Sequence, residues 1–97
     1  MVYLALNFYS LISEQYVLKE ANELCTSIEV IDEVKECKSA IAYLKKRGSD
    51  IAFRRMESTA IYPKGCYKYT GGTYAYWNTY NSGTPNNHGQ PICKKGE

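Results

Sequence analysis

Hydrophobic residues recur at helical intervals in the first half of the chain and alternate with polar residues in the second half. Residues 32–48 give the clearest helical pattern, and four residues share one face of it: Val34, Cys37, Ile41 and Leu44. Asp32 is the expected N-cap, and Gly48 follows three basic residues as a typical C-terminal stop. Weaker helical spacing of apolar residues predicts another helix over residues 10–24.

After Gly48 the hydrophobic period changes from helical to two, which is typical of half-buried strands. Residues 50–58 alternate in two sets, with Ile51, Phe53 and Arg55 in one and Ala52, Arg54 and Met56 in the other. The segments "CYKYT" and "TYAYWNTY" flank "GG", which favours a β-hairpin, and "ICKK" is a short final strand. Helical segments followed by strands predict an α+β fold, with two N-terminal helices packed on a small antiparallel sheet of three or four strands.

The two strands of the predicted hairpin each have an aromatic face. Alternation places Tyr67 and Tyr69 on one face, opposite Cys66 and Lys68. On the returning strand, one face carries Tyr74, Tyr76, Asn78 and Tyr80, and the other carries Ala75 and Trp77.

Four cysteines in 97 residues are typical of a small disulfide-stapled domain from an oxidising compartment, which is a secreted, cell-surface or organelle-lumen location. The cysteines are Cys25, Cys37, Cys66 and Cys93. Free buried thiols and a zinc site are the alternatives, but the short Cys-x-x-Cys pair of most zinc sites is missing. The sequence therefore favours two disulfides and no metal.

Charge is distributed unevenly along the chain. Residues 1–37 contain seven acidic and two basic residues, a net of −5, whereas residues 38–97 contain ten basic and three acidic residues, a net of +7. Weak salt bridges across the fold are the simplest expected use of this asymmetry. A nucleic-acid binder would show one dominant basic patch, so nucleic acid is not an expected partner.

The first dozen residues are strongly apolar, and we treat residues 1–24 as an N-terminal arm and residues 25–97 as the disulfide-stapled domain. The arm lacks the basic region and cleavage site of a signal peptide, so no targeting signal is expected in this chain, and it is too short to span a bilayer. Membrane contact is therefore expected only peripherally or through a partner. The residues expected to dock onto a protein partner are Val2, Tyr3, Leu4, Leu6, Phe8, Tyr9, Leu11 and Ile12.

The motifs "GCYKY", "NTY" and "QPICK" give residues 25–94 a resemblance to a small cysteine-containing domain. That domain occurs, often repeated, in secreted or surface multidomain proteins of microalgae and other protists, and has no assigned activity. The matching residues are Cys37, Pro63, Gly65, Cys66, Tyr67, Asn78, Ile92, Cys93 and Lys94. The "GCY" opening also looks like the start of WSC-type carbohydrate-binding domains, which carry more cysteines.

Four cysteines allow three pairings, and their placement ranks them. A Cys37–Cys66 disulfide would join the helix to the strand that it must cover, leaving Cys25–Cys93 to tie the ends of the domain together. Cys25–Cys37 with Cys66–Cys93 ranks second.

Residues for catalysis are sparse. A Cys/His hydrolase needs a free thiol beside a histidine, but the one histidine, His88, lies in a polar loop, and a disulfide would occupy the cysteines. Nucleophile elbows and phosphate loops are also missing. The sequence predicts a protein that is not an enzyme and needs no cofactor.

The aromatic run is the candidate binding surface. Its candidate residues are Tyr67, Tyr69, Tyr74, Tyr76, Trp77 and Tyr80. Tyrosine and tryptophan are common at glycan and protein interfaces, but strands also contain them for packing alone. Two functions follow: a structural subunit that docks onto a larger assembly through the arm, and an extracellular module that recognises a glycan or protein through the hairpin.

Overall fold

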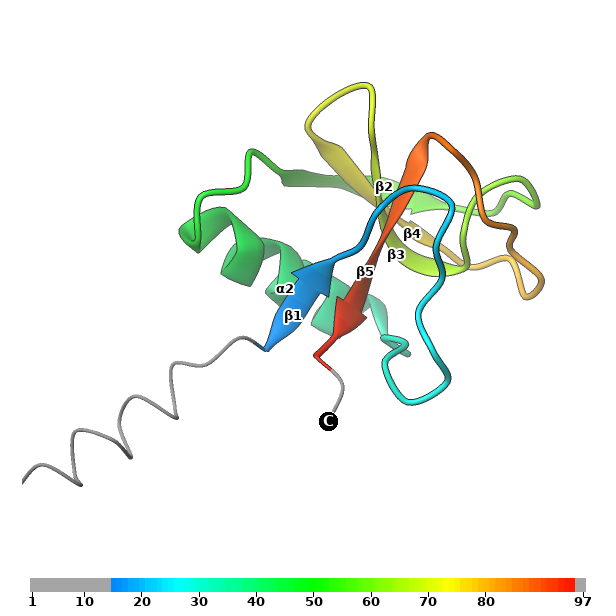
Figure 1. Ribbon diagram of the computed structural model, residues 1–97, viewed down its shortest axis with the longest axis horizontal. Coiled ribbons are helices and arrows are strands. Elements are labelled where there is room, and N and C mark those ends of the chain that lie inside the picture. The colour runs from blue at the N-terminus through cyan, green and yellow to red at the C-terminus, as the bar shows by residue number, and fades with distance from the viewer. Residues whose placement is uncertain (1–14, 96–97) are drawn as a thin grey trace, which may run out of the picture.

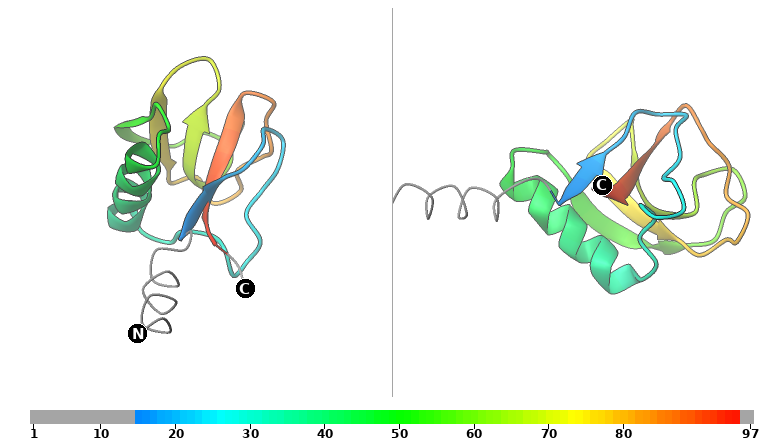
Figure 2. Two further views of the ribbon diagram at one scale, coloured as in Figure 1. Left: turned by 60° about the vertical axis from the view of Figure 1, so that its left-hand side comes forward. Right: turned by 60° about the horizontal axis from the view of Figure 1, so that its bottom comes forward.

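The computed structural model describes residues 15–95, which fold into one α-helix packed against a five-stranded sheet. The elements are β1 (Tyr16–Leu18), α2 (Val34–Lys46), β2 (Ala52–Glu57), β3 (Gly65–Tyr69), β4 (Tyr74–Asn78) and β5 (Gly89–Lys94). The sheet order is β1-β5-β3-β4-β2, and α2 covers one of its faces (Figures 1 and 2). The predicted α+β class is confirmed.

The helix α2 forms where the apolar spacing predicts it and ends as predicted. Gly48 has a φ of 104°, and its N–H and that of Ser49 bond to the last carbonyls of the helix. The start differs from the prediction, because Glu33 is the N-cap, in place of Asp32, and no side chain caps the helix. Packing of the apolar face therefore contributes more to this helix than capping does.

The second predicted helix, over residues 10–24, is wrong for residues 15–24, the part that the structure describes. Residues 16–18 form β1, which pairs antiparallel with β5, so that Val17 lies opposite Cys93. Part of the predicted arm thus belongs to the sheet of the domain. The docking residues Val2 to Ile12 lie outside the described residues.

The sheet is mixed, which corrects the expectation of an antiparallel sheet with three or four strands. The hairpin of β3 and β4 forms as predicted, and β5 adds antiparallel to the other side of β3. By contrast, β2 runs parallel to β4, at the edge opposite β1. A parallel neighbour is possible because the connection from β2 leads through the whole of β3 before the chain enters β4.

The core lies between α2 and the sheet. Nine buried residues form it: Ile31, Cys37, Ala40, Ile41, Leu44, Ile51, Cys66, Ala75 and Ile92. Trp77 and Phe53 pack against this cluster from the sheet side. The core therefore occupies the face of the sheet that is turned toward α2.

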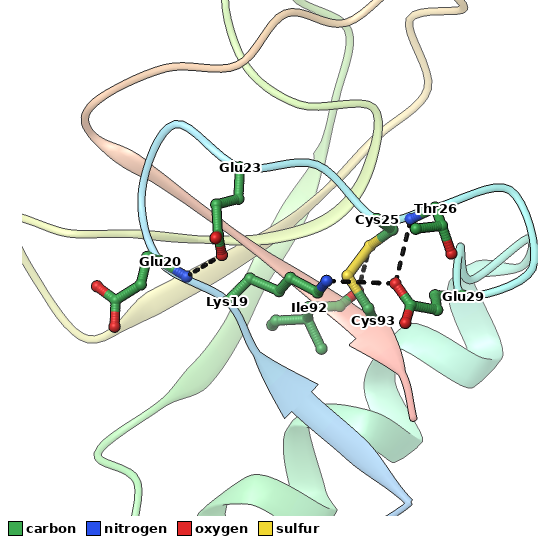
Figure 3. Close-up of a disulfide and its surroundings, with 8 residues drawn as sticks. All are labelled: Lys19, Glu20, Glu23, Cys25, Thr26, Glu29, Ile92 and Cys93. Atoms are coloured by element: carbon green, nitrogen blue, oxygen red, sulfur yellow. Dashed lines mark hydrogen bonds and ion pairs between the residues drawn. A yellow bond between two sulfur atoms is a disulfide. The ribbon is translucent and has the colours of Figure 1, made fainter. Parts of the chain in front are cut away.

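Two disulfides fasten this arrangement, and they form the pairing ranked first from the sequence. Cys37–Cys66 joins α2 to β3 with a Cα–Cα distance of 5.5 Å. Cys25–Cys93 joins the loop after β1 to β5 (Figure 3), with a Cα–Cα distance of 5.6 Å. Both disulfides fit an oxidising compartment.

Candidate functional site

The face of the sheet turned away from α2 carries a tyrosine cluster, which we call the tyrosine face. It consists of Tyr62, Tyr67, Tyr69, Tyr74 and Tyr76. Strands β3 and β4 supply four of the rings at alternate positions, and the loop before β3 supplies Tyr62. Because Cys66 and Ala75 point into the core, the pleat directs their tyrosine neighbours to the opposite side.

Four rings of the tyrosine face, Tyr62, Tyr67, Tyr69 and Tyr76, pack on one another. Tyr67 stacks against Tyr62, with ring centroids 5.0 Å apart and planes 10° apart, and against Tyr76, with centroids 5.4 Å apart. Tyr69 meets Tyr62 edge-on at 6.4 Å, and His88 lies 6.1 Å from Tyr69. Mutual stacking fixes these rings in position, so the cluster is a preformed surface.

Tyr67 is the centre of the cluster and is only 2 % exposed. Its hydroxyl donates a hydrogen bond to the carboxylate of Glu57 on β2. Burial raises the pKa of Tyr67 strongly, and the bond to the Glu57 carboxylate raises it further. Tyr67 is therefore a neutral hydrogen-bond donor at physiological pH, and it holds the Glu57 carboxylate in place.

Two arginines from β2 lie over the rings of β4. The guanidinium carbon of Arg54 is 4.7 Å from the ring centre of Tyr74, and that of Arg55 is 5.4 Å from the ring centre of Tyr76. These distances are typical of cation–π contacts. Arg54 and Arg55 therefore both reach the tyrosine face, although they are adjacent in sequence.

A β-bulge explains how two adjacent arginines share a face. The pairing of β2 with β4 skips a residue between Phe53, which lies opposite Ala75, and Arg55, which lies opposite Tyr76. The extra residue is Arg54, and strict alternation is lost at that point. The prediction that Arg55 shares a face with Phe53 is therefore wrong.

The loop that carries Tyr62 is held by the side chain of Asn78, which is 1 % exposed. Its Nδ2 donates to the carbonyls of Thr59, Tyr62 and Pro63 at 2.9, 3.2 and 2.9 Å. Its Oδ1 accepts from the N–H groups of Thr59 and Tyr80 at 2.9 and 3.2 Å. One buried amide thus fixes the loop that places a ring of the cluster.

The same loop is also braced by the segment before β5. The Thr84 N–H donates to the Tyr62 carbonyl at 3.0 Å, and the Asn86 Nδ2 donates to the Ile61 carbonyl at 2.7 Å. At Gly83 an added Cβ would lie 2.2 Å from the backbone nitrogen of Lys64, so only glycine fits there. Two loops therefore support one side of the tyrosine face.

Together these side chains line a shallow depression of about 280 Å³. Its lining residues are Arg55, Glu57, Tyr62, Tyr67, Tyr69 and Tyr76. The depression offers phenol hydroxyls, a guanidinium and a carboxylate, but no nucleophile beside a base. Its chemistry suits hydrogen bonding and stacking.

The structure separates the predicted binding residues. Tyr67, Tyr69, Tyr74 and Tyr76 lie together on the tyrosine face. Trp77 packs against the core on the opposite side, and Tyr80 lies beyond the end of β4 without a ring contact to any tyrosine among residues 15–95.

Sequence reasoning missed four members of the site: Arg54, Arg55, Glu57 and Tyr62. Only the adjacent arginine pair could have been a signal, since two charges in succession break the alternation of a half-buried strand. The position of Tyr62 depends on the Asn78 hydrogen bonds, and the resemblance contains Asn78 without giving its role.

No protein-family model, curated protein or solved structure matches this chain. The resemblance to the cysteine-containing protist domain therefore stays a prediction. Within residues 15–95, no helix has the length and hydropathy to cross a membrane, and no three side chains of His, Cys, Asp or Glu converge on a position for a metal.

Proposed function

We propose that the domain is a non-enzymatic recognition module of an oxidising compartment, and that it binds a protein partner through the tyrosine face. The observation that carries this proposal is the preformed stack of Tyr62, Tyr67 and Tyr76 with Arg55 over its end. Tyrosine and arginine are the residues most enriched where protein interfaces gain their binding energy. Because the rings are already ordered, binding loses little side-chain entropy.

A protein partner fits this surface better than a glycan does. Sugar rings bind aromatic side chains by lying flat on an exposed ring face. Here the Tyr67 ring stacks on two neighbours, and arginines lie over the rings of Tyr74 and Tyr76. These contacts occupy ring faces on which a sugar would lie, which favours the mixed polar and aromatic contacts of protein interfaces.

The test compares tyrosines of equal exposure on and off the tyrosine face. Tyr69 and Tyr74 are 38 % and 44 % exposed, and Tyr80, off the face, is 41 % exposed. We expect Y69S/Y74S to lose the partner that the full wild-type chain captures from the native extracellular or lumenal fraction, and Y80S to retain it. Equal capture by all three chains would contradict the proposal. Unchanged melting temperatures and intact disulfides are the folding control.

Docking of a structural subunit through the arm is the second proposal. It is supported by the position of β1, because this strand forms a sheet edge and leads directly back to residues 1–12. The Gln15 N–H donates to the Tyr43 hydroxyl at 2.9 Å, so the arm joins the domain beside α2. Deletion of residues 1–12 abolishes capture under this proposal, and leaves capture intact if the tyrosine face alone binds the partner.

A further inference from the structure

The two arginines of the bulge present unused hydrogen-bond donors. Arg54 and Arg55 are both exposed, and no carboxylate among residues 15–95 lies within ion-pair distance of either. The nearest acidic residue along β2, Glu57, accepts the hydrogen bond of Tyr67. The one ion pair between described residues, Lys19–Glu29, lies beside the Cys25–Cys93 disulfide (Figure 3).

A cation–π contact with a tyrosine ring leaves each guanidinium able to bind an anion. A guanidinium that lies over a ring uses its flat face, whereas its N–H donors point outward in the plane of the group. Those donors match the two oxygens of a carboxylate. The rings of Tyr74 and Tyr76 therefore hold the arginines in place without consuming their donors.

We propose that Arg54 and Arg55 form a binding site for an extended acidic segment of the protein partner, in which each arginine binds one carboxylate. This inference rests on the proposed function and names the chemistry of the partner. The chain as a whole has a net charge of +2, so its overall charge does not oppose an acidic ligand. Since β2 is an edge strand of the sheet, a ligand reaches Arg54 and Arg55 without crossing another strand.

The spacing of the supporting rings selects an extended ligand. Tyr74 and Tyr76 are two residues apart on one strand, so their side chains are separated by roughly 6.5–7 Å. Carboxylates on alternate residues of an extended peptide repeat at about the same distance. An acidic residue at every second position therefore places one carboxylate at each guanidinium.

The test uses two fluorescent peptides of equal composition and charge, added to the full chain. One alternates Glu and Thr, and the other arranges the same residues as Glu-Glu-Thr-Thr repeats. We expect the alternating peptide to bind wild type at least fivefold more tightly. We expect R54Q/R55Q to weaken that binding at least tenfold, whereas K45Q/K46Q, which removes two exposed charges from the end of α2, changes it less than twofold.

A further variant distinguishes the effect of the planar, two-donor guanidinium from the effect of positive charge alone. R54K/R55K keeps both charges but replaces each planar fork by a single ammonium, so we expect it to lose most of the preference for the alternating peptide. If R54Q/R55Q and K45Q/K46Q lost the same amount of affinity for the alternating peptide, net charge alone would explain the binding and the inference would be overturned. Tighter binding of heparin than of the alternating peptide, with the same dependence on Arg54 and Arg55, would assign the site to an anionic glycan instead.

The inference and the proposed function can fail separately. If Y69S/Y74S abolishes capture of the native partner while R54Q/R55Q leaves both capture and peptide binding intact, the recognition module stands and the acidic-segment inference is wrong. If R54Q/R55Q abolishes peptide binding but Y69S/Y74S leaves capture of the native partner unchanged, the carboxylate site stands and the proposed use of the tyrosine face fails.

Discussion

Replacement of Asn78 tests the structural basis of the site most directly. Its side chain makes five hydrogen bonds to the backbone of Thr59, Tyr62, Pro63 and Tyr80, and it is almost completely buried. An alanine at this position leaves three carbonyls and two N–H groups without their partner. The loop that carries Tyr62 then loses its main attachment to β4.

The expected destabilisation follows from these contacts. A buried polar group that loses its partner costs about 1–3 kcal/mol. Thr59 is partly exposed and Tyr80 is exposed, so water replaces some of the lost bonds. We therefore expect N78A to lower the free energy of unfolding by about 3–5 kcal/mol, with a decrease in melting temperature of roughly 15–30 °C. That is a large share of the 5–15 kcal/mol typical of a small domain.

An aspartate at the same position provides a sharper test, because it has nearly the shape of asparagine. An ionised carboxylate has no donor for the three carbonyls that Asn78 bonds. Burial and these carbonyls raise the pKa of such an aspartic acid. Its neutral form is therefore the better tolerated one, and the stability of N78D falls as pH rises through that pKa. We expect N78D to be less stable at pH 7 than at pH 4, relative to N78A at each pH.

Urea denaturation followed by the fluorescence of Trp77, the only tryptophan, measures both variants. N81A is the matched control, since Asn81 is exposed and lies three residues further along the chain. Two results together would refute the assigned role of Asn78. One is that N78A lowers the free energy of unfolding by less than about 1 kcal/mol, and the other is that N78D and N78A are equally stable at both pH 4 and pH 7.

Three further measurements test other parts of the fold. C25A/C93A opens a loop whose ends are 68 residues apart and should lower the free energy of unfolding by about 4 kcal/mol in urea denaturation. Burial raises the pKa of Tyr67 above its ordinary value of 10.0, so its stabilising contribution is complete below pH 10 and is lost as pH rises further. Y67F should therefore weaken the pH dependence of unfolding above pH 10. Gly65 has a φ of 89°, so G65A should cost about 1–2 kcal/mol in the same assay, whereas G72A, where an added Cβ meets nothing, should be neutral.

The elements that the sequence predicts well are those with a local cause. The helix α2 has a continuous apolar face and a glycine stop, and the β3–β4 hairpin has Gly71 and Gly72 in the short connection between its strands. The strand β1 has no such cause, because three residues next to an apolar arm fit a helical spacing equally well. Its strand conformation comes from pairing with β5, at the far end of the chain, beside the Cys25–Cys93 disulfide.

The site was predicted only as far as strand alternation holds. Alternation correctly separates Tyr67 and Tyr69 from Cys66, and Tyr74 and Tyr76 from Trp77. It places Arg55 on the wrong face, since the bulge shifts the register by one residue. The parallel pairing of β2 with β4 has no local signal either, because either edge of the hairpin could accept another strand.

Because of the bulge, we expect β2 to tolerate the deletion of one residue, which a regular strand would not tolerate. Phe53 lies opposite Ala75 and Arg55 opposite Tyr76, so Arg54 is the surplus residue. Deletion of Arg54 restores one-to-one pairing and leaves every other side chain of β2 on its present face. The lost contact is an exposed cation–π pair worth about 0.5–1 kcal/mol, so we expect a total loss below about 2 kcal/mol in urea denaturation.

Deletion of Met56 is the matched control, since this residue is 53 % exposed and contributes little packing. Its loss shifts Glu57 toward the core face and removes the acceptor of the Tyr67 hydroxyl. Because the buried Tyr67 hydroxyl then lacks its partner, we expect this deletion to cost about 1–3 kcal/mol more than deletion of Arg54. If the two deletions were equally damaging, Arg54 would not be the surplus residue. The same variant also tests the two-arginine site. If deletion of Arg54 left binding of the alternating peptide unchanged, Arg54 would not contribute to that binding and the proposed two-arginine site would be wrong.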